Sequence, residues 1–177
     1  MPRLLDRSPF PKTASEVVVR GERIRVRANQ IILWVSLTIQ RVKAPNPTAA
    51  PFPAILDTGH NHSFSIHERH LLDWAGLRPE DLGVLRPIRD RGQRVMLRPA
   101  NIWVHANVPH HRDRLADRPP CLVAASQGVA VYPGAEFPRL PILGLRAIAE
   151  NELVLKVDGP RREATLRTVV RWWWPLA

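Results

Sequence analysis

A short acidic motif, Asp57-Thr58-Gly59, is the part of this sequence whose residue types could carry out chemistry. It follows the apolar residues 52–56, which predict a strand that ends in a turn and leaves polar side chains at its end. Residues 141–144 (Pro-Ile-Leu-Gly) form a second apolar segment that ends in glycine. A carboxylate at a strand end can act as a general acid or base, so Asp57 is the candidate catalytic group.

Histidines beside the motif leave a metal site open as an alternative. Asp57, His60 and His62 have side chains that suit zinc. Four more histidines could add to them: His67, His70, His110 and His111. Solvated or hydrogen-bonded histidines are the simpler interpretation, so we expect no metal and no cofactor. Because imidazole titrates near neutral pH, charged His60 and His62 are expected to favour ionised aspartates and to shift a pH optimum.

The two segments resemble the retropepsin-like aspartic proteases, the single-domain relatives of the retroviral proteases. The resemblance covers residues 31–168 and is best at residues 54–64 and 142–155. It implies an all-β acid-protease fold, a closed barrel or sheet with one or two short helices. It also implies an aspartic endopeptidase that acts on polypeptides.

Individual roles follow from the same resemblance. Asp57 is implied as the catalyst, Thr58 as the residue that locks two active-site loops together, and Gly59 as the turn. Gly144 is implied as the supporting glycine, because glycine permits close approach of two backbones. Ser63 is expected to hydrogen-bond near the loop.

The expected chemistry requires two carboxylates that share one proton, because like charges so close cannot both be ionised. The chain has one Asp-Thr-Gly, and Asp158-Gly159 lacks the intervening threonine or serine. We therefore expect the second carboxylate to come from another copy of the chain, in a homodimer with one site on its two-fold axis. The three tryptophans at positions 172–174 are expected either in the dimer interface or against the core of their own chain.

The sequence departs from the family pattern after the motif. Members usually have a small residue and then an acidic one, where this chain has His60 and Asn61. In retroviral members that acidic residue pairs with an arginine directly after the supporting glycine, where this chain has Leu145 and then Arg146. Both partners are absent together, so no single buried charge is left behind. Asn61 remains the candidate for contacts with the substrate backbone.

A flap should cover the cleft of such an enzyme and exclude water from it. Residues 87–97 are the candidate, with Arg91, Gly92 and Gln93 at the tip of a hairpin. The alternative is an ordinary exposed hairpin, because the glycine-rich flap signature of the family is missing.

The composition of the chain limits the classes of partner that we expect it to bind. The 177 residues favour one domain, and 26 Lys and Arg against 16 Asp and Glu give a net charge of +10. Such a surface can attract nucleic acid, anionic lipid or acidic polypeptide. Arg23, Arg25 and Arg27 alternate along one predicted strand, but aromatic residues are not interleaved with them, so nucleic acid is an unlikely partner. The rival hypothesis is a non-catalytic dimeric module that binds a protein or nucleic acid on the same fold.

The elements that must position Asp57 are expected to be short strands, because 18 prolines and 9 glycines disfavour long helices. Strands are predicted at residues 23–27 and 31–39, and a short helix is predicted after Ser65 as its N-cap. Residues 1–15 are expected to be a flexible arm before one domain at 16–177. No apolar stretch has the length of a signal peptide or membrane span, so we expect a cytoplasmic protein without membrane contact.

Overall fold

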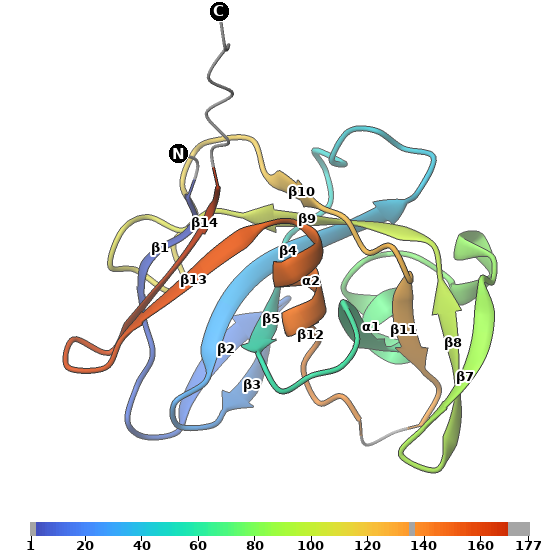
Figure 1. Ribbon diagram of the computed structural model, residues 1–177, viewed down its shortest axis with the longest axis horizontal. Coiled ribbons are helices and arrows are strands. Elements are labelled where there is room, and N and C mark those ends of the chain that lie inside the picture. Colours follow the sequence, from blue (N-terminus) through green and yellow to red (C-terminus); the bar gives the residue numbers. More distant parts are fainter. Residues whose placement is uncertain (1–2, 135–136, 170–177) are drawn as a thin grey trace, which may run out of the picture.

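A computed structural model describes residues 3–134 and 137–169 of the chain (Figure 1). It contains two short α-helices, α1 (Glu68–Asp73) and α2 (Leu145–Glu150), and a 3-10 turn, η1 (Pro79–Leu82). The rest of the regular structure consists of the strands β1 (Arg3–Pro9), β2 (Ser15–Val19), β3 (Glu22–Val26), β4 (Ile31–Ile39), β5 (Phe52–Asp57), β6 (Phe64–His67), β7 (Arg86–Asp90), β8 (Gln93–Arg98), β9 (Ala100–His105), β10 (Cys121–Val123), β11 (Val129–Tyr132), β12 (Ile142–Gly144), β13 (Leu153–Asp158) and β14 (Glu163–Thr168).

The strands form three sheets. The largest has nine strands in the order β10-β9-β4-β5-β12-β6-β11-β8-β7, and two smaller sheets have the orders β1-β14-β13 and β2-β3. An all-β architecture with two short helices is therefore confirmed. The large sheet is open at β10 and β7, so the closed barrel named among the expectations does not form within the described residues.

An apolar strand inside the large sheet, β4, pairs antiparallel with β5 and β9. Ile32, Leu33 and Val35 in β4 are completely buried. A continuous apolar run, rather than strict alternation, is typical of a strand that is covered on both faces. The strand predicted at residues 31–39 is confirmed with the same bounds.

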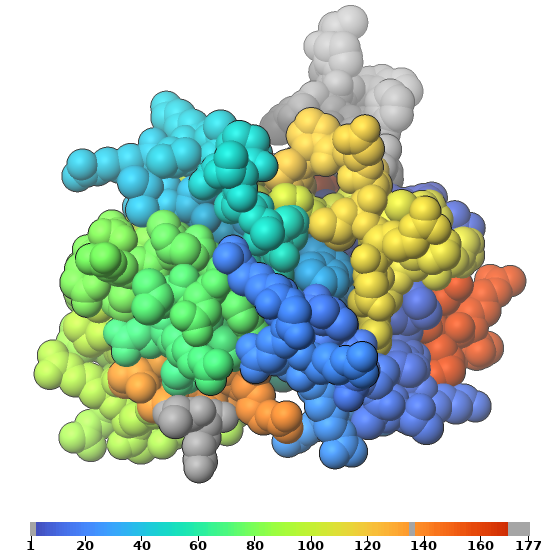
Figure 2. All heavy atoms as spheres, turned by 180° about the vertical axis from the view of Figure 1, so that it is seen from behind, coloured from blue at the N-terminus to red at the C-terminus, as the bar shows by residue number. Residues whose placement is uncertain are grey.

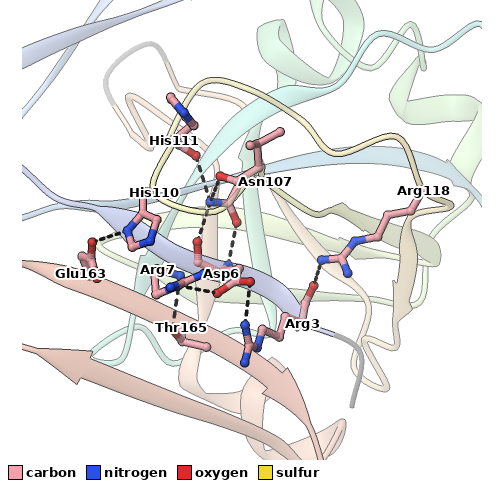
Figure 3. Close-up of polar contacts among 10 residues, drawn as sticks. Arg3, Asp6, Arg7, Asn107, His110, His111, Arg118, Glu163 and Thr165 are labelled. Carbon is pink, nitrogen blue, oxygen red and sulfur yellow. Dashed lines mark hydrogen bonds and ion pairs between the residues drawn. The ribbon is translucent and has the colours of Figure 1, made fainter.

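The N-terminal residues do not form the expected flexible arm. Residues 3–9 are strand β1, which pairs antiparallel with β14, and Leu4 and Leu5 are only 1% exposed. Buried Asn107 fixes this strand, since its side-chain oxygen accepts from the backbone N–H of Asp6 and its amide donates to the Asp6 carbonyl (Figure 3). Local composition could not predict this strand, because the hydrogen bonds that hold it join residues 101 positions apart.

Local patterns also misplaced two other features. Ser65 does not cap the first helix; it lies in β6, and His67 is the N-cap, with its imidazole accepting from the backbone N–H of Arg69. Strands β6 and β11 were not predicted, because each is only four residues long. They lie side by side as a parallel pair inside the large sheet, and this tertiary pairing rather than local propensity defines them.

The C-terminal tryptophans and the expected lack of a membrane span are the two remaining expectations. Residues 172–174, the three tryptophans, lie outside the described residues, so their packing stays a prediction. Within residues 3–134 and 137–169, no helix is long and apolar enough to cross a membrane.

Candidate active site

Asp57 lies at the end of β5, one of three neighbouring strands in the large sheet. Strand β12 is inserted between β5 and β6, parallel to the first and antiparallel to the second, and β5 and β6 are joined by the loop at residues 58–63. Within this arrangement Gly144, the last residue of β12, is paired with Asp57, the last residue of β5. The two segments singled out in the sequence, 87 positions apart, are therefore direct neighbours.

The loop holds Asp57 at the surface. The backbone N–H of Gly59 donates to Asp57 Oδ1 at 2.8 Å, and the N–H of His60 donates to the Asp57 carbonyl at 3.2 Å. Asp57, Thr58 and Gly59 are all exposed, and the Thr58 side chain has no hydrogen-bond partner among the described residues. The carboxylate is therefore oriented by its own turn but is open to solvent and to a partner.

Gly144 allows the loop to lie directly on β12. Its backbone N–H donates to the carbonyl of Ser63 at 3.1 Å. A Cβ atom at this position would be 2.7 Å from the carbonyl oxygen of His60 and closer still to that of His62. Both neighbours are backbone atoms that cannot move without the loop, so only glycine fits here.

The side chain of His60 points from the Asp57 loop into the interior of the protein. It is 8% exposed, and its Nε2 lies 2.6 Å from the hydroxyl of buried Ser65. Burial, with a smaller contribution from neighbouring His62, lowers the pKa of His60 to about 4. The expectation that His60 titrates near neutral pH is therefore wrong, because the imidazole is removed from water. The pKa of His62 is also lowered, mainly by burial.

The low pKa of His60 predicts a stability that falls with acidification. An unfolded chain takes up a proton near pH 6.5 and the folded protein only near 4, so the unfolded state binds more protons between these values. Stability is then lost as pH falls through this range. His60→Gln should make the dependence of unfolding free energy on pH shallower. Part of the dependence should remain in this variant, because burial also lowers the pKa of His70 to about 4. Urea unfolding at several pH values measures this, and an unchanged slope would contradict it.

Ser63 and Asn61 have different surroundings. The Ser63 hydroxyl is buried and donates to Glu150 Oε2 at 3.2 Å, and Glu150 also accepts from the Ser126 hydroxyl at 2.7 Å. Ser63 therefore ties the Asp57 loop to the end of helix α2. Asn61 is exposed, on the surface beside the motif.

A cleft of about 370 Å³ opens beside Asp57. Asp57 is its only carboxylate among the described residues, and apolar side chains of Ile55, Leu140 and Ile142 form part of its wall. Four arginines complete the charged lining: Arg25, Arg27, Arg91 and Arg139. The sequence pointed to Asp57 but not to Arg139 or Phe137, which reach the cleft only through the tertiary fold.

The hairpin predicted around Gly92 is confirmed, and its tip reaches this cleft. Strands β7 and β8 pair antiparallel, and Arg91 and Gly92 have φ values of 48° and 77°, the left-handed conformations of a two-residue hairpin turn. The Arg91 guanidinium lies over the ring of Phe137 at 4.1 Å. Arg91 lines the cleft together with Asp57, so one residue of the hairpin tip borders it, and the role of the hairpin as a flap stays a prediction.

Asp90 anchors the hairpin to the body of the protein. It accepts a hydrogen bond from the hydroxyl of Tyr132 in β11, and His62 Nε2 lies 3.9 Å from its Oδ2. Asp90 and Tyr132 were not identified from the sequence, because β11 was not recognised as a strand. The contact with His62 connects the hairpin to the Asp57 loop.

The histidines beside the motif do not gather into a metal site. Within the described part of the chain, no three His, Cys, Asp or Glu side chains are grouped so that they could hold a metal ion. His67 and His70 lie on and next to helix α1, where the His70 ring stacks on Trp74 at 3.8 Å between centroids.

Comparison of the chain with protein-family models, with curated proteins and with solved structures gave no match. The site consists of an exposed carboxylate that its own turn orients, at the end of a strand paired with β12. Beside it lies an arginine-lined cleft that Arg91, at the tip of the hairpin, also borders.

Proposed function

We propose that this protein is a homodimeric aspartic endopeptidase, in which Asp57 of each copy contributes one carboxylate to a shared site. The observation that carries the proposal is the pairing of Asp57 with Gly144 on strands β5 and β12, with the Asp57 loop resting on the glycine. This arrangement supports a carboxylate on a rigid base at the mouth of a cleft, as hydrolysis of a bound peptide requires.

The proposed reaction uses two carboxylates and one water molecule. The ionised carboxylate takes a proton from the water, whose oxygen attacks the carbonyl carbon of the peptide bond. The protonated carboxylate donates its proton to the carbonyl oxygen. The tetrahedral intermediate then collapses as its C–N bond breaks. The carboxylate that took the proton of water gives it to the leaving nitrogen, and the other carboxylate takes a proton back from a hydroxyl of the intermediate, which becomes the new carboxylic acid. Two carboxylates held close together share one proton, which provides both forms at once.

The need for a second copy follows from the cleft. Asp57 is its only carboxylate among the described residues, and the turn at residues 57–59 is exposed. In a symmetric dimer the same turn of the partner would approach it, so that the two carboxylates meet on the axis. Thr58 is exposed and has no hydrogen-bond partner in the described chain, so in the proposed dimer it would make the contact between the two loops.

A second candidate function is a non-catalytic dimeric module that binds an anionic partner. The four arginines in the Asp57 cleft favour it, since such a cleft can hold an anion without performing any reaction. The position of Asp57 favours the enzyme, because a carboxylate among arginines weakens the binding of an anion unless it has another role.

The test is hydrolysis of casein by the purified protein at acidic and neutral pH over a range of protein concentrations. We expect cleavage that a statine-type inhibitor blocks. The activity per chain should fall on dilution, because dissociation of the dimer separates the two carboxylates. Full activity of a dilute monomer would contradict the proposed dimer, and no cleavage at any concentration would favour the binding module.

A further inference from the structure

The walls of the Asp57 cleft are unusually basic. Arg25 lies in β3, and Arg27 directly follows that strand. Arg139 lines the same cleft from the distant segment at residues 137–140. Figure 2 shows an orange segment, from the region near residue 140, beside blue N-terminal segments. Arg25, Arg27 and Arg139 also share the adjoining hollow with Ala14 and Ala28, so the positive charge continues beyond the Asp57 cleft.

Within residues 3–134 and 137–169, the structure gives the guanidinium groups of Arg25, Arg27 and Arg139 no partner. All three residues are exposed, and among the described residues no ion pair or hydrogen bond of their guanidinium groups is found. Arg23, two positions before Arg25 on β3, differs because it pairs with Glu16 at 3.6 Å. Arginines of like charge gathered at one cleft repel one another, and a ligand that carries negative charge relieves that repulsion.

We propose that the cleft selects acidic polypeptides, with Arg25, Arg27 and Arg139 binding carboxylate side chains of the substrate on either side of Asp57. The inference rests on the proposed endopeptidase function and assigns its substrate class. The planar guanidinium group matches a carboxylate through two parallel hydrogen bonds, so such contacts fix the position of a peptide as well as attract it.

The lining of the cleft favours a peptide over a nucleic acid. Single-stranded nucleic acid is held by exposed aromatic rings on which its bases stack. Among the described residues that line the cleft, Phe137 is the only aromatic one, and the guanidinium of Arg91 already covers its ring at 4.1 Å. The remaining wall combines arginines with the aliphatic side chains of Ile55, Leu140 and Ile142, which suits alternating acidic and apolar side chains of an extended peptide.

The test uses two fluorogenic peptides that differ only in having Glu or Gln on both sides of the scissile bond. At about pH 6, where Glu is ionised, the protein should cleave the Glu peptide with a lower KM. Arg25→Ala, Arg27→Ala and Arg139→Ala should each raise that KM by about fivefold and should raise the KM of the Gln peptide by a smaller factor, so that the ratio of the two KM values approaches one. Arg23→Ala is the matched control, because Arg23 lies on the same strand but is already paired. At about pH 3.5 the preference should disappear, because the Glu side chains are protonated.

Binding to the Asp57→Asn protein separates this inference from the proposed function. Fluorescence anisotropy with labelled Glu and Gln peptides should show tighter binding of the Glu peptide, and Arg25→Ala should remove the difference. If the wild type cleaves both peptides equally, acidic selection is wrong and the endopeptidase stands. If it cleaves neither but the arginine-dependent binding remains, the endopeptidase is wrong and acidic selection stands. Tighter, arginine-dependent binding of a labelled single-stranded oligonucleotide would overturn acidic selection in favour of nucleic acid.

Discussion

Replacement of Asp57 by asparagine should abolish peptide hydrolysis and leave the fold intact. Asparagine has nearly the same shape, and its side-chain oxygen can still accept the hydrogen bond that Gly59 donates to Asp57 Oδ1. It cannot be ionised or give up a proton, so neither half of the shared pair can form. We expect a loss of about 10⁴-fold in kcat/KM, as for removal of a central catalytic group in other hydrolases, measured on casein-derived peptides.

Asp158→Asn is the matched control for this variant. Asp158 belongs to the Asp158-Gly159 pair that lacks the threonine or serine of the motif, and it lies at the end of β13, where it pairs with Arg161 at 3.5 Å. We expect this protein to keep full activity. Because Asp57 is exposed, the unfolding free energy of Asp57→Asn should stay within about 0.5 kcal/mol of the wild type. Unchanged hydrolysis by a folded Asp57→Asn protein would contradict the catalytic assignment.

Gly144→Ala should produce the largest loss of stability among simple substitutions near the site. The added methyl group would lie 2.7 Å from the carbonyl oxygen of His60 and closer still to that of His62. Relief of this overlap requires movement of the loop away from β12, which breaks the hydrogen bond from Gly144 N–H to the Ser63 carbonyl. We expect a decrease of about 3 kcal/mol in unfolding free energy and loss of activity with it, measured by urea denaturation and peptide hydrolysis.

Gly159→Ala provides the control for the chemical change itself. Nothing lies within 4 Å of a Cβ atom placed at Gly159, in the turn between β13 and β14. The same substitution there should change stability by no more than about 0.5 kcal/mol. Equal stability of the Gly144→Ala and Gly159→Ala proteins would show that the loop does not rest on β12 as described.

The chemistry-bearing segments could be found from the sequence because their signals are local. An apolar run that ends in Asp-Thr-Gly predicts a strand and its turn, and residues 141–144 stand out as a second apolar segment that ends in glycine. The hairpin at Arg91-Gly92 is equally local, since two residues in left-handed conformation define it. Each of these features depends on residues within about ten positions of one another.

The remaining features depend on contacts between distant parts of the chain. Arg139 meets Arg25 and Arg27 only because the segment before β12 folds back beside β3. Local composition predicts neither their shared cleft nor the hydrogen bond between Asn107 and Asp6. Burial of His60, which moves its pKa away from the neutral range, likewise depends on β6 packing beneath the Asp57 loop.

The most direct test of the account is whether one active site needs Asp57 from two chains. Wild-type protein is refolded from urea with a roughly ninefold excess of Asp57→Asn protein, so that random pairing leaves about a tenth of wild-type chains with a wild-type partner. If the two carboxylates act together, hydrolysis per wild-type chain should fall to about that fraction of the value for wild type refolded alone. Undiminished hydrolysis per wild-type chain would show that each copy works by itself and would contradict the shared site.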